Sequence, residues 1–212
     1  MAVAYKAEQL ESLVVLPHIR IAGIGLDQQN AFTGSLKKDE VDTELIDLDQ
    51  ADDWIELVNL CDSKPESVVV LNTAARNNTG VSSYGETLNS TVAELKCKLV
   101  TLWVINRQRD SLELLKGYMD ALPNAAVHVV RNGYFGEEKK FELYNGSKLR
   151  KDVEERGGQS ITFPDLADRV SDDLYSKRFS ITKAATELPL GNRAELLRWR
   201  GEVKKALEGT LR

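Results

Sequence analysis

The fold is decided by two short apolar runs, SVVVLNTAAR at residues 67–76 and KLVTLWVI at residues 98–105. In the first run the residues from Val68 to Leu71 are all apolar, and in the second Thr101 is the only polar residue between Leu99 and Ile105. A strand with one face in water alternates apolar and polar side chains, whereas a strand covered on both faces is apolar throughout. Both runs therefore predict strands in the middle of a sheet that helices cover on both sides.

On either side of these runs, β-rich segments alternate with longer helical patterns. Strands are predicted at residues 19–26, 44–48, 67–72, 98–105, 125–131 and 160–163. Helices are predicted at residues 51–60, 111–122 and 193–211, where apolar residues recur at helical spacing. This alternation is typical of βαβ units. The sequence therefore predicts an α/β fold of three layers, with a largely parallel sheet and helices on both of its faces.

A chain of 212 residues is within the range of one domain. We expect one α/β domain over residues 1–190, with a basic amphipathic helix at residues 191–212 packed on it. No long apolar run occurs, and Lys6, Glu8 and Glu11 interrupt the N-terminus where a secretory signal would be apolar. A cytoplasmic protein with no membrane partner is therefore expected, with Cys61 and Cys97 as reduced thiols.

Charge is distributed unevenly along the chain. The formal net charge is −5, which argues against non-specific coating of nucleic acid through overall charge. Residues 39–66 contain many carboxylates and a single cation, Lys64, whereas the last predicted helix is net basic. Such faces are ordinarily only solvated. The alternative is a pair of complementary docking surfaces, either between subunits or toward a partner.

Polar residues follow three of the predicted strands. The first strand ends in Asp27-Gln28-Gln29-Asn30, the strand at 67–72 ends in Asn72-Thr73, and the strand at 125–131 ends in Asn132-Gly133. Each segment alone is ordinary turn chemistry. In open parallel sheets, however, ligands bind beyond the carboxyl ends of the strands. The three segments together therefore favour a shared cleft.

As a set, these segments resemble the ParA/MinD family of P-loop ATPases. The segment at residues 129–136, together with Tyr5-Lys6-Ala7, most resembles the TraL-like and MobD-like branch in plasmid transfer and mobilisation. Asp27 and Asn30 resemble the turn that senses the γ-phosphate, with Gln28 in place of the usual proline. The segment ending in Asn72 and Thr73 is similar to the Walker B strand, with Asn72 in place of the metal-linked aspartate. Asn132 resembles the residue that recognises the adenine base. The resemblance thus implies ATP with Mg²⁺ as cofactor and a nucleotide site made of Asp27, Asn30, Asn72, Thr73 and Asn132.

The phosphate-binding loop of that family is absent, because no G-x-x-x-x-G-K-[ST] motif occurs in the chain. In the family this loop and its strand precede a helix like the one expected at residues 2–12. The first, central strand is therefore expected to be missing, which would leave two neighbouring strands with unpaired edges. Two explanations stay open: the native protein starts upstream of Met1, or it is a degenerate relative.

The resemblance implies a nucleotide-binding protein of plasmid mobilisation, conjugal transfer or stability that does not hydrolyse ATP at the family's rate. Its implied partners are a second copy in a homodimer, plasmid transfer or partition proteins, and DNA bound non-specifically through the basic C-terminal helix. The alternative is a non-enzymatic interaction module with the same α/β body. A Rossmann-type enzyme is disfavoured because the chain has no G-x-G-x-x-G turn.

Overall fold

A computed structural model gives the arrangement of the chain. It describes residues 10–15, 22–25, 42–44, 46–65, 69–74, 78–123 and 125–210, with the backbone alone for residues 10–15, 22–25, 42–44, 72–74 and 78–79. The strands are β1 (Leu10–Val15), β2 (Ala22–Gly25), β3 (Asp42–Glu44), β4 (Val69–Ala74), β5 (Val100–Ile105), β6 (Ala126–Asn132) and β7 (Ser160–Phe163). The helices are α2 (Ala51–Ser63), α3 (Asn78–Thr91), α4 (Arg109–Ala121), α5 (Glu142–Asn145), α6 (Lys148–Glu155), α7 (Asp168–Ser176), α8 (Ile181–Glu187) and α9 (Leu190–Leu207), with 3-10 turns η1 (Gly133–Phe135) and η2 (Glu138–Lys140).

The seven strands form one sheet in the order β3-β2-β4-β1-β5-β6-β7. The pairs β2–β3, β2–β4, β5–β6 and β6–β7 are parallel. Strand β1 is antiparallel to both of its neighbours, β4 and β5, so every other strand runs in one direction. The predicted α/β fold with a largely parallel sheet is confirmed.

Strand β1 corrects one expectation from the sequence. Residues 10–12 belong to a strand rather than to a helix at residues 2–12, whose first eight residues lie outside the described ones. The two central strands are also not left with unpaired edges, because β1 lies between β4 and β5 and pairs with both. The physical reason is that Leu13, Val14 and Val15 form an apolar, β-prone run that can donate and accept hydrogen bonds on both sides.

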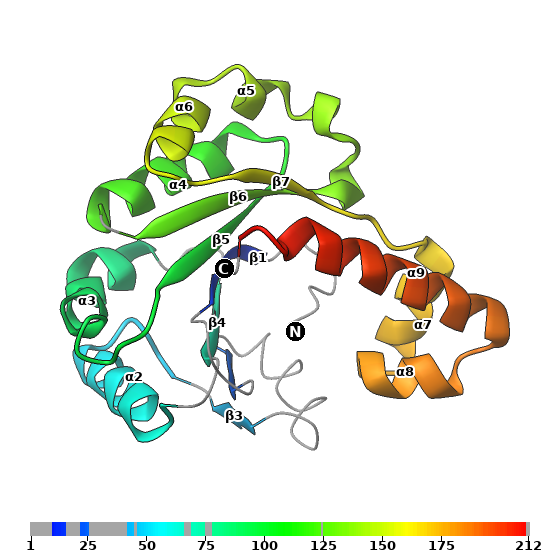
Figure 1. Cartoon of the computed structure of the whole chain (residues 1–212), viewed down its shortest axis with the longest axis horizontal. Helices are drawn as coiled ribbons and strands as arrows, with labels where there is room; N and C mark the ends of the chain where they lie inside the picture. Colours follow the sequence, from blue (N-terminus) through cyan, green and yellow to red (C-terminus); the bar gives the residue numbers. More distant parts are fainter. Residues whose placement is uncertain are drawn as a thin grey trace.

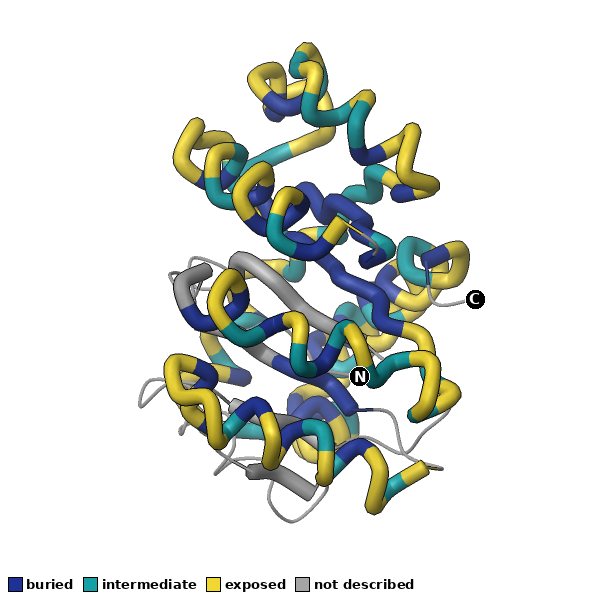
Figure 2. The backbone as a smooth tube through the Cα atoms, turned by 90° about the vertical axis from the view of Figure 1, so that its left-hand side faces the viewer, coloured by how far each residue is buried: buried dark blue, intermediate teal, exposed yellow. Residues whose placement is uncertain are grey.

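Helices cover both faces of the sheet, which gives the three predicted layers (Figure 1). On one face α2, α3 and α4 pack on inward residues such as Leu71, Trp103 and Val129, and this core extends to Phe141 and Val153 beside α5 and α6. On the other face Val100, Leu102 and Val130 lie under the end of α9. The helices α7, α8 and α9 share a further core around Leu174, Leu196 and Trp199. Burial is concentrated in the strands and along the inward sides of the helices (Figure 2).

None of the helices in the described ranges has the length and hydrophobicity needed to cross a membrane. The helix predicted at residues 193–211 is observed as α9, and three residues of its predicted apolar face, Leu196, Trp199 and Val203, are buried. Cys61 is buried and Cys97 is half-buried, and both are free thiols. Burial raises the pKa of Cys61 to about 11, so its thiol is protonated at neutral pH.

The buried side chain of His128 in β6 predicts a pH-dependent stability. Its Nδ1 accepts a hydrogen bond from the backbone N–H of Gln159, at 3.1 Å. Burial, and then nearby Lys98, lower the pKa of His128. Below pH ~6.5 the unfolded chain therefore binds a proton at this histidine that the folded chain does not. The free energy of unfolding should fall by at most ~1.4 kcal/mol for each unit by which the pH is lowered.

His128→Asn keeps an acceptor near the position of Nδ1 and removes the titration. Urea unfolding at about pH 7.5 and about pH 5.5 should show a smaller loss of stability for this variant than for the parent chain. Equal losses in the two proteins would show that His128 does not contribute to the pH dependence.

Candidate functional site

The residues predicted to bind nucleotide are distributed over two parts of the sheet. Asp27 and Asn30 lie outside the described residues. Asn72 and Thr73 lie within β4, and Asn132 is the last residue of β6. Strand register places Asn72 level with Leu13, Leu102 and His128. Asn132 is four residues further along β6, ~13 Å in the strand direction, so the backbone does not bring Asn72 and Asn132 together.

Asn132 has the clearest signature of a binding residue in the described part of the chain. It is only 5% exposed. Its Oδ1 accepts a hydrogen bond from the backbone N–H of Tyr134, at 3.1 Å, which caps the 3-10 turn η1. Its Nδ2 is buried and makes no hydrogen bond in the described structure. A buried donor without an acceptor costs about 1–3 kcal/mol, so this amide group is an uncommon feature that requires an explanation.

The chain segments that follow β6 and β7 approach each other closely beside Asn132. Asn132 pairs with Phe163 in the last position of the β6–β7 ladder. A Cβ atom on Gly133 would lie 2.3 Å from the carbonyl oxygen of Phe163 and 2.9 Å from the backbone nitrogen of Asp165. Only glycine fits there without moving the backbone. The segment after β7 is held in turn by Trp199, whose Nε1–H donates to the carbonyl oxygen of Pro164 at 2.8 Å.

The preceding residue, Arg131, fixes the end of β6 from the other face of the sheet, since successive side chains of a strand alternate. Arg131 is only 3% exposed and forms an ion pair with Glu138 at 2.9 Å. It also donates to Thr162, to Asn145 and to the carbonyl oxygen of Ser160. The guanidinium group of Arg131 thus holds η2, α5 and β7 around the carboxyl end of β6. Its role is to position the segment that carries Asn132.

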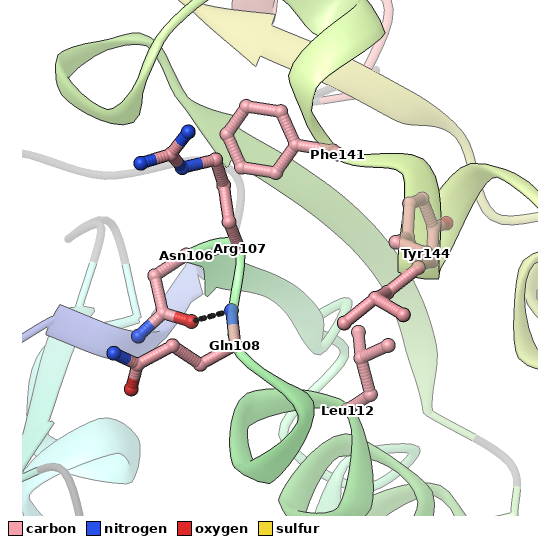
Figure 3. A pocket seen from close by; sticks show the side chains of 7 residues that line it. Asn106, Arg107, Gln108, Leu112, Phe141 and Tyr144 are labelled. Carbon is pink, nitrogen blue, oxygen red and sulfur yellow. Dashed lines mark hydrogen bonds between the residues drawn. The ribbon is translucent and has the colours of Figure 1, made fainter.

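A shallow surface depression lies beyond the carboxyl end of β5 (Figure 3). It is lined by residues from the start of α4 and from around α5: Asn106, Arg107, Gln108, Leu112, Phe141, Leu143 and Tyr144. Ile105 and Arg131 form the last pair of the β5–β6 ladder, so the next residues, Asn106 and Asn132, lie at neighbouring strand ends. The Oδ1 of Asn106 accepts a hydrogen bond from the backbone N–H of Gln108, at 2.7 Å.

This polar strand end was not among the residues predicted from the sequence. The available signal was of the same kind as for Asn132, namely an asparagine at the end of a predicted strand.

The edge formed by β5, β6 and β7 carries one buried side-chain donor whose orientation is fixed. Asn132 supplies that donor, and Tyr134, whose backbone N–H bonds to Asn132, is 54% exposed. The carboxyl group of Asp165 is partly desolvated by its neighbours, which raises its pKa. Within the described residues, no three His, Cys, Asp or Glu side chains are grouped so that they could hold a metal ion.

Comparison with known proteins adds one close relative. Protein MobD from Acidithiobacillus ferrooxidans is 76% identical to this chain over 185 residues, which are 87% of this chain and 82% of the relative. No family model matches the sequence, and no solved structure matches it significantly. The predicted resemblance to MobD-like proteins is confirmed, whereas kinship with ParA and MinD stays a prediction. The chain belongs to the MobD protein family.

Proposed function

We propose that this chain is a plasmid mobilisation protein that binds an adenine nucleotide at the carboxyl edge of its sheet, through Asn132, without hydrolysing it. The mobilisation role is supported by 76% identity to protein MobD. The nucleotide role is supported by one observation above all, the buried Nδ2 of Asn132 that has no acceptor among the described residues. A donor kept in this state lowers the stability of the free protein, and a bound acceptor would remove that cost.

The residues around Asn132 fit the edge of a purine base. The amide Nδ2–H of Asn132 matches a ring nitrogen that accepts one hydrogen bond. Its Oδ1 is already held by Tyr134, so the orientation of the amide is fixed before any ligand arrives. The nearby ring of Tyr134 offers an aromatic face of the kind on which bases stack, a contact that is worth ~1–3 kcal/mol.

The proposal assigns the other predicted residues to the phosphate end of the ligand, away from Asn132. Asp27 and Asn30 would face the terminal phosphate, and Asn72 and Thr73 would lie on the side of a Mg²⁺ ion. The nucleotide would supply a bound anionic group whose presence alters the affinity for a partner, either a second copy or another mobilisation protein. The chain has no lysine-bearing phosphate loop, so we expect binding without turnover. Measurable Mg²⁺-dependent release of phosphate from ATP would contradict this part.

Isothermal titration calorimetry with ADP and with ATP tests the proposal. Asn132→Asp keeps an oxygen acceptor for Tyr134 but replaces the donor by a second acceptor, so the dissociation constant should rise at least tenfold, ~1.4 kcal/mol. In Asn132→Ala, loss of the cap is offset by loss of the buried donor, so binding should fall while the free energy of unfolding changes by less than about 1 kcal/mol.

Asn89→Ala is the matched control, because the side-chain amide of this α3 asparagine donates to Glu86 at the surface. The control should bind like the parent chain. Equal affinity of the parent chain and the two Asn132 variants, or no nucleotide binding by the parent chain, would remove the nucleotide role. The chain would then act in mobilisation as a non-enzymatic interaction module, a role that the charged surfaces of α2 and α9 favour.

A further inference from the structure

Helix α9 has a second apolar stripe on its outer side. Its inner side buries Leu196, Trp199 and Val203. Four other residues at helical spacing, Leu190, Ala194, Leu197 and Gly201, are all exposed, with Leu190 at 76% and Leu197 at 54%. Residues three, four and seven apart lie on one face of a helix. Two exposed leucines that alternate with two small residues give a surface on which another helix can approach closely.

The border of this stripe is basic. Arg200, Lys204 and Lys205 are in the same part of α9, and none of them makes an ion pair with a residue that the structure describes. Arg198 differs, because Glu195 and Glu202 neutralise it at 2.7 Å and 2.6 Å. The unpaired positive charge is thus concentrated in the C-terminal half of the helix.

Helix α2 presents the complementary surface. Ile55 is 51% exposed in the middle of its outer side. Around it lie the exposed carboxylates of Asp52, Glu56 and Asp62, and α2 contains no lysine or arginine. None of these carboxylates forms an ion pair within the described residues. The outer side of α2 therefore complements the outer stripe of α9 in two ways. Both surfaces have an exposed apolar centre, and the charges around the two centres are opposite in sign.

We propose that α2 of one copy of this chain docks on the outer stripe of α9 of a second copy, so that the chains associate head to tail. Helix α2 belongs to the layer on one face of the sheet and α9 to the layer on the other, so the two helices cannot meet within one molecule (Figure 1). Parallel pairing of α9 with α9 is disfavoured, since Arg200 and Lys204 would face the same residues of the partner. An antiparallel pairing brings Asp52 opposite Lys204 and Asp62 opposite Arg193, with Ile55 on the leucine stripe between them.

A contact between two different surfaces does not close on itself as a twofold dimer. It extends into a ring or a filament, and its extent depends on protein concentration. One helix pair buries less surface than the ~1,600 Å² of a standard interface, so the association is weak and sensitive to salt.

Sedimentation velocity of the full chain over a range of concentrations tests the proposal. The parent chain should show a weight-average mass that rises with concentration at about 50 mM NaCl and falls back toward the monomer at about 500 mM. Asp52→Lys with Asp62→Lys should weaken association at least tenfold, and so should Arg200→Glu with Lys204→Glu. Each double variant carries like charges on both surfaces. Their equimolar mixture should associate again, because every contact then joins opposite charges.

Asp120→Lys with Asp172→Lys is the charge-matched control, with both positions exposed and on other helices, and it should associate like the parent chain. A parent chain that stays monomeric would overturn the proposal. Association that is unchanged in both double variants, or not restored in their mixture, would also overturn it. Salt-sensitive binding of a monomeric chain to a DNA duplex through Arg200 and Lys204 would assign the basic surface to nucleic acid instead.

Discussion

Gly133→Ala is expected to lower the free energy of unfolding by about 3 kcal/mol, because the new methyl group has no space in the folded chain. The added Cβ would lie 2.3 Å from the carbonyl oxygen of Phe163 and 2.9 Å from the backbone nitrogen of Asp165. Both atoms belong to the backbone, so no side-chain rotation relieves the overlap. The segments after β6 and β7 must then separate, and Asn132 moves with them. Urea unfolding measures the loss, and nucleotide affinity should fall in parallel.

The control for this prediction is Gly117→Ala in the middle of α4. A Cβ at Gly117 would have no other part of the described structure within 4 Å beyond the local backbone of its own helix, so the substitution only improves helix propensity. It should raise the free energy of unfolding by up to about 1 kcal/mol. If Gly133→Ala and Gly117→Ala had the same effect, the close approach at the end of β6 would not exist.

Trp103→Ala is expected to have the largest effect on stability, a loss of about 3–5 kcal/mol. The side chain is 2% exposed and lies between β5 and α4. Its ring is 5.1 Å from the ring of Tyr118, and its Nε1–H donates to the carbonyl oxygen of Ser111 at 3.3 Å. Removing the ring leaves a cavity at the centre of the larger core and releases the start of α4 from the sheet.

Two variants separate the contributions of Trp103. Trp103→Phe keeps an aromatic ring and loses the donor to Ser111, so it should cost about 1–2 kcal/mol. Leu143→Ala removes a side chain that is 57% exposed, and its effect should stay within about 0.5 kcal/mol. A loss of less than about 1 kcal/mol in Trp103→Ala would mean that β5 and α4 are not packed as described.

The strands of the sheet were more predictable than the helices around it. The strands predicted at 67–72, 98–105 and 125–131 correspond to β4, β5 and β6, in which burial on both faces favours largely apolar runs. The strand predicted at 160–163 is the edge strand β7, whose sequence SITF alternates polar and apolar residues and is partly buried. Helix α3 has the sequence NTGVSSYGETLNST, in which serine, threonine, asparagine and glycine are poor helix formers. Its helical form depends on packing, through Val81 and Leu88, which local sequence does not encode. The strand predicted at 44–48 is observed as β3 at Asp42–Glu44, since Leu48 and the residues after it lead into α2.

The candidate site was predictable to the extent that it depends on strand ends. Asn132 was identified because it ends a predicted strand and resembles the family's base-recognising residue, and the structure adds that its donor is buried without an acceptor in the described part of the chain. The contribution of Asn106 was missed, although it also comes directly after a predicted strand. The close approach of Gly133 to the segment after β7 depends on contacts between residues thirty positions apart. Local pattern carries no information about such contacts.

The central claim is that the side-chain amide of Asn132 is the donor to a bound adenine base, and nuclear magnetic resonance can observe that group directly. Its two N–H signals are identified by their absence from the spectrum of Asn132→Asp. During titration with ADP up to about 1 mM, these two signals should shift and saturate, while those of Asn89 stay in place. Signals of Asn132 that do not move, whether ADP shifts other residues or none at all, would contradict the account.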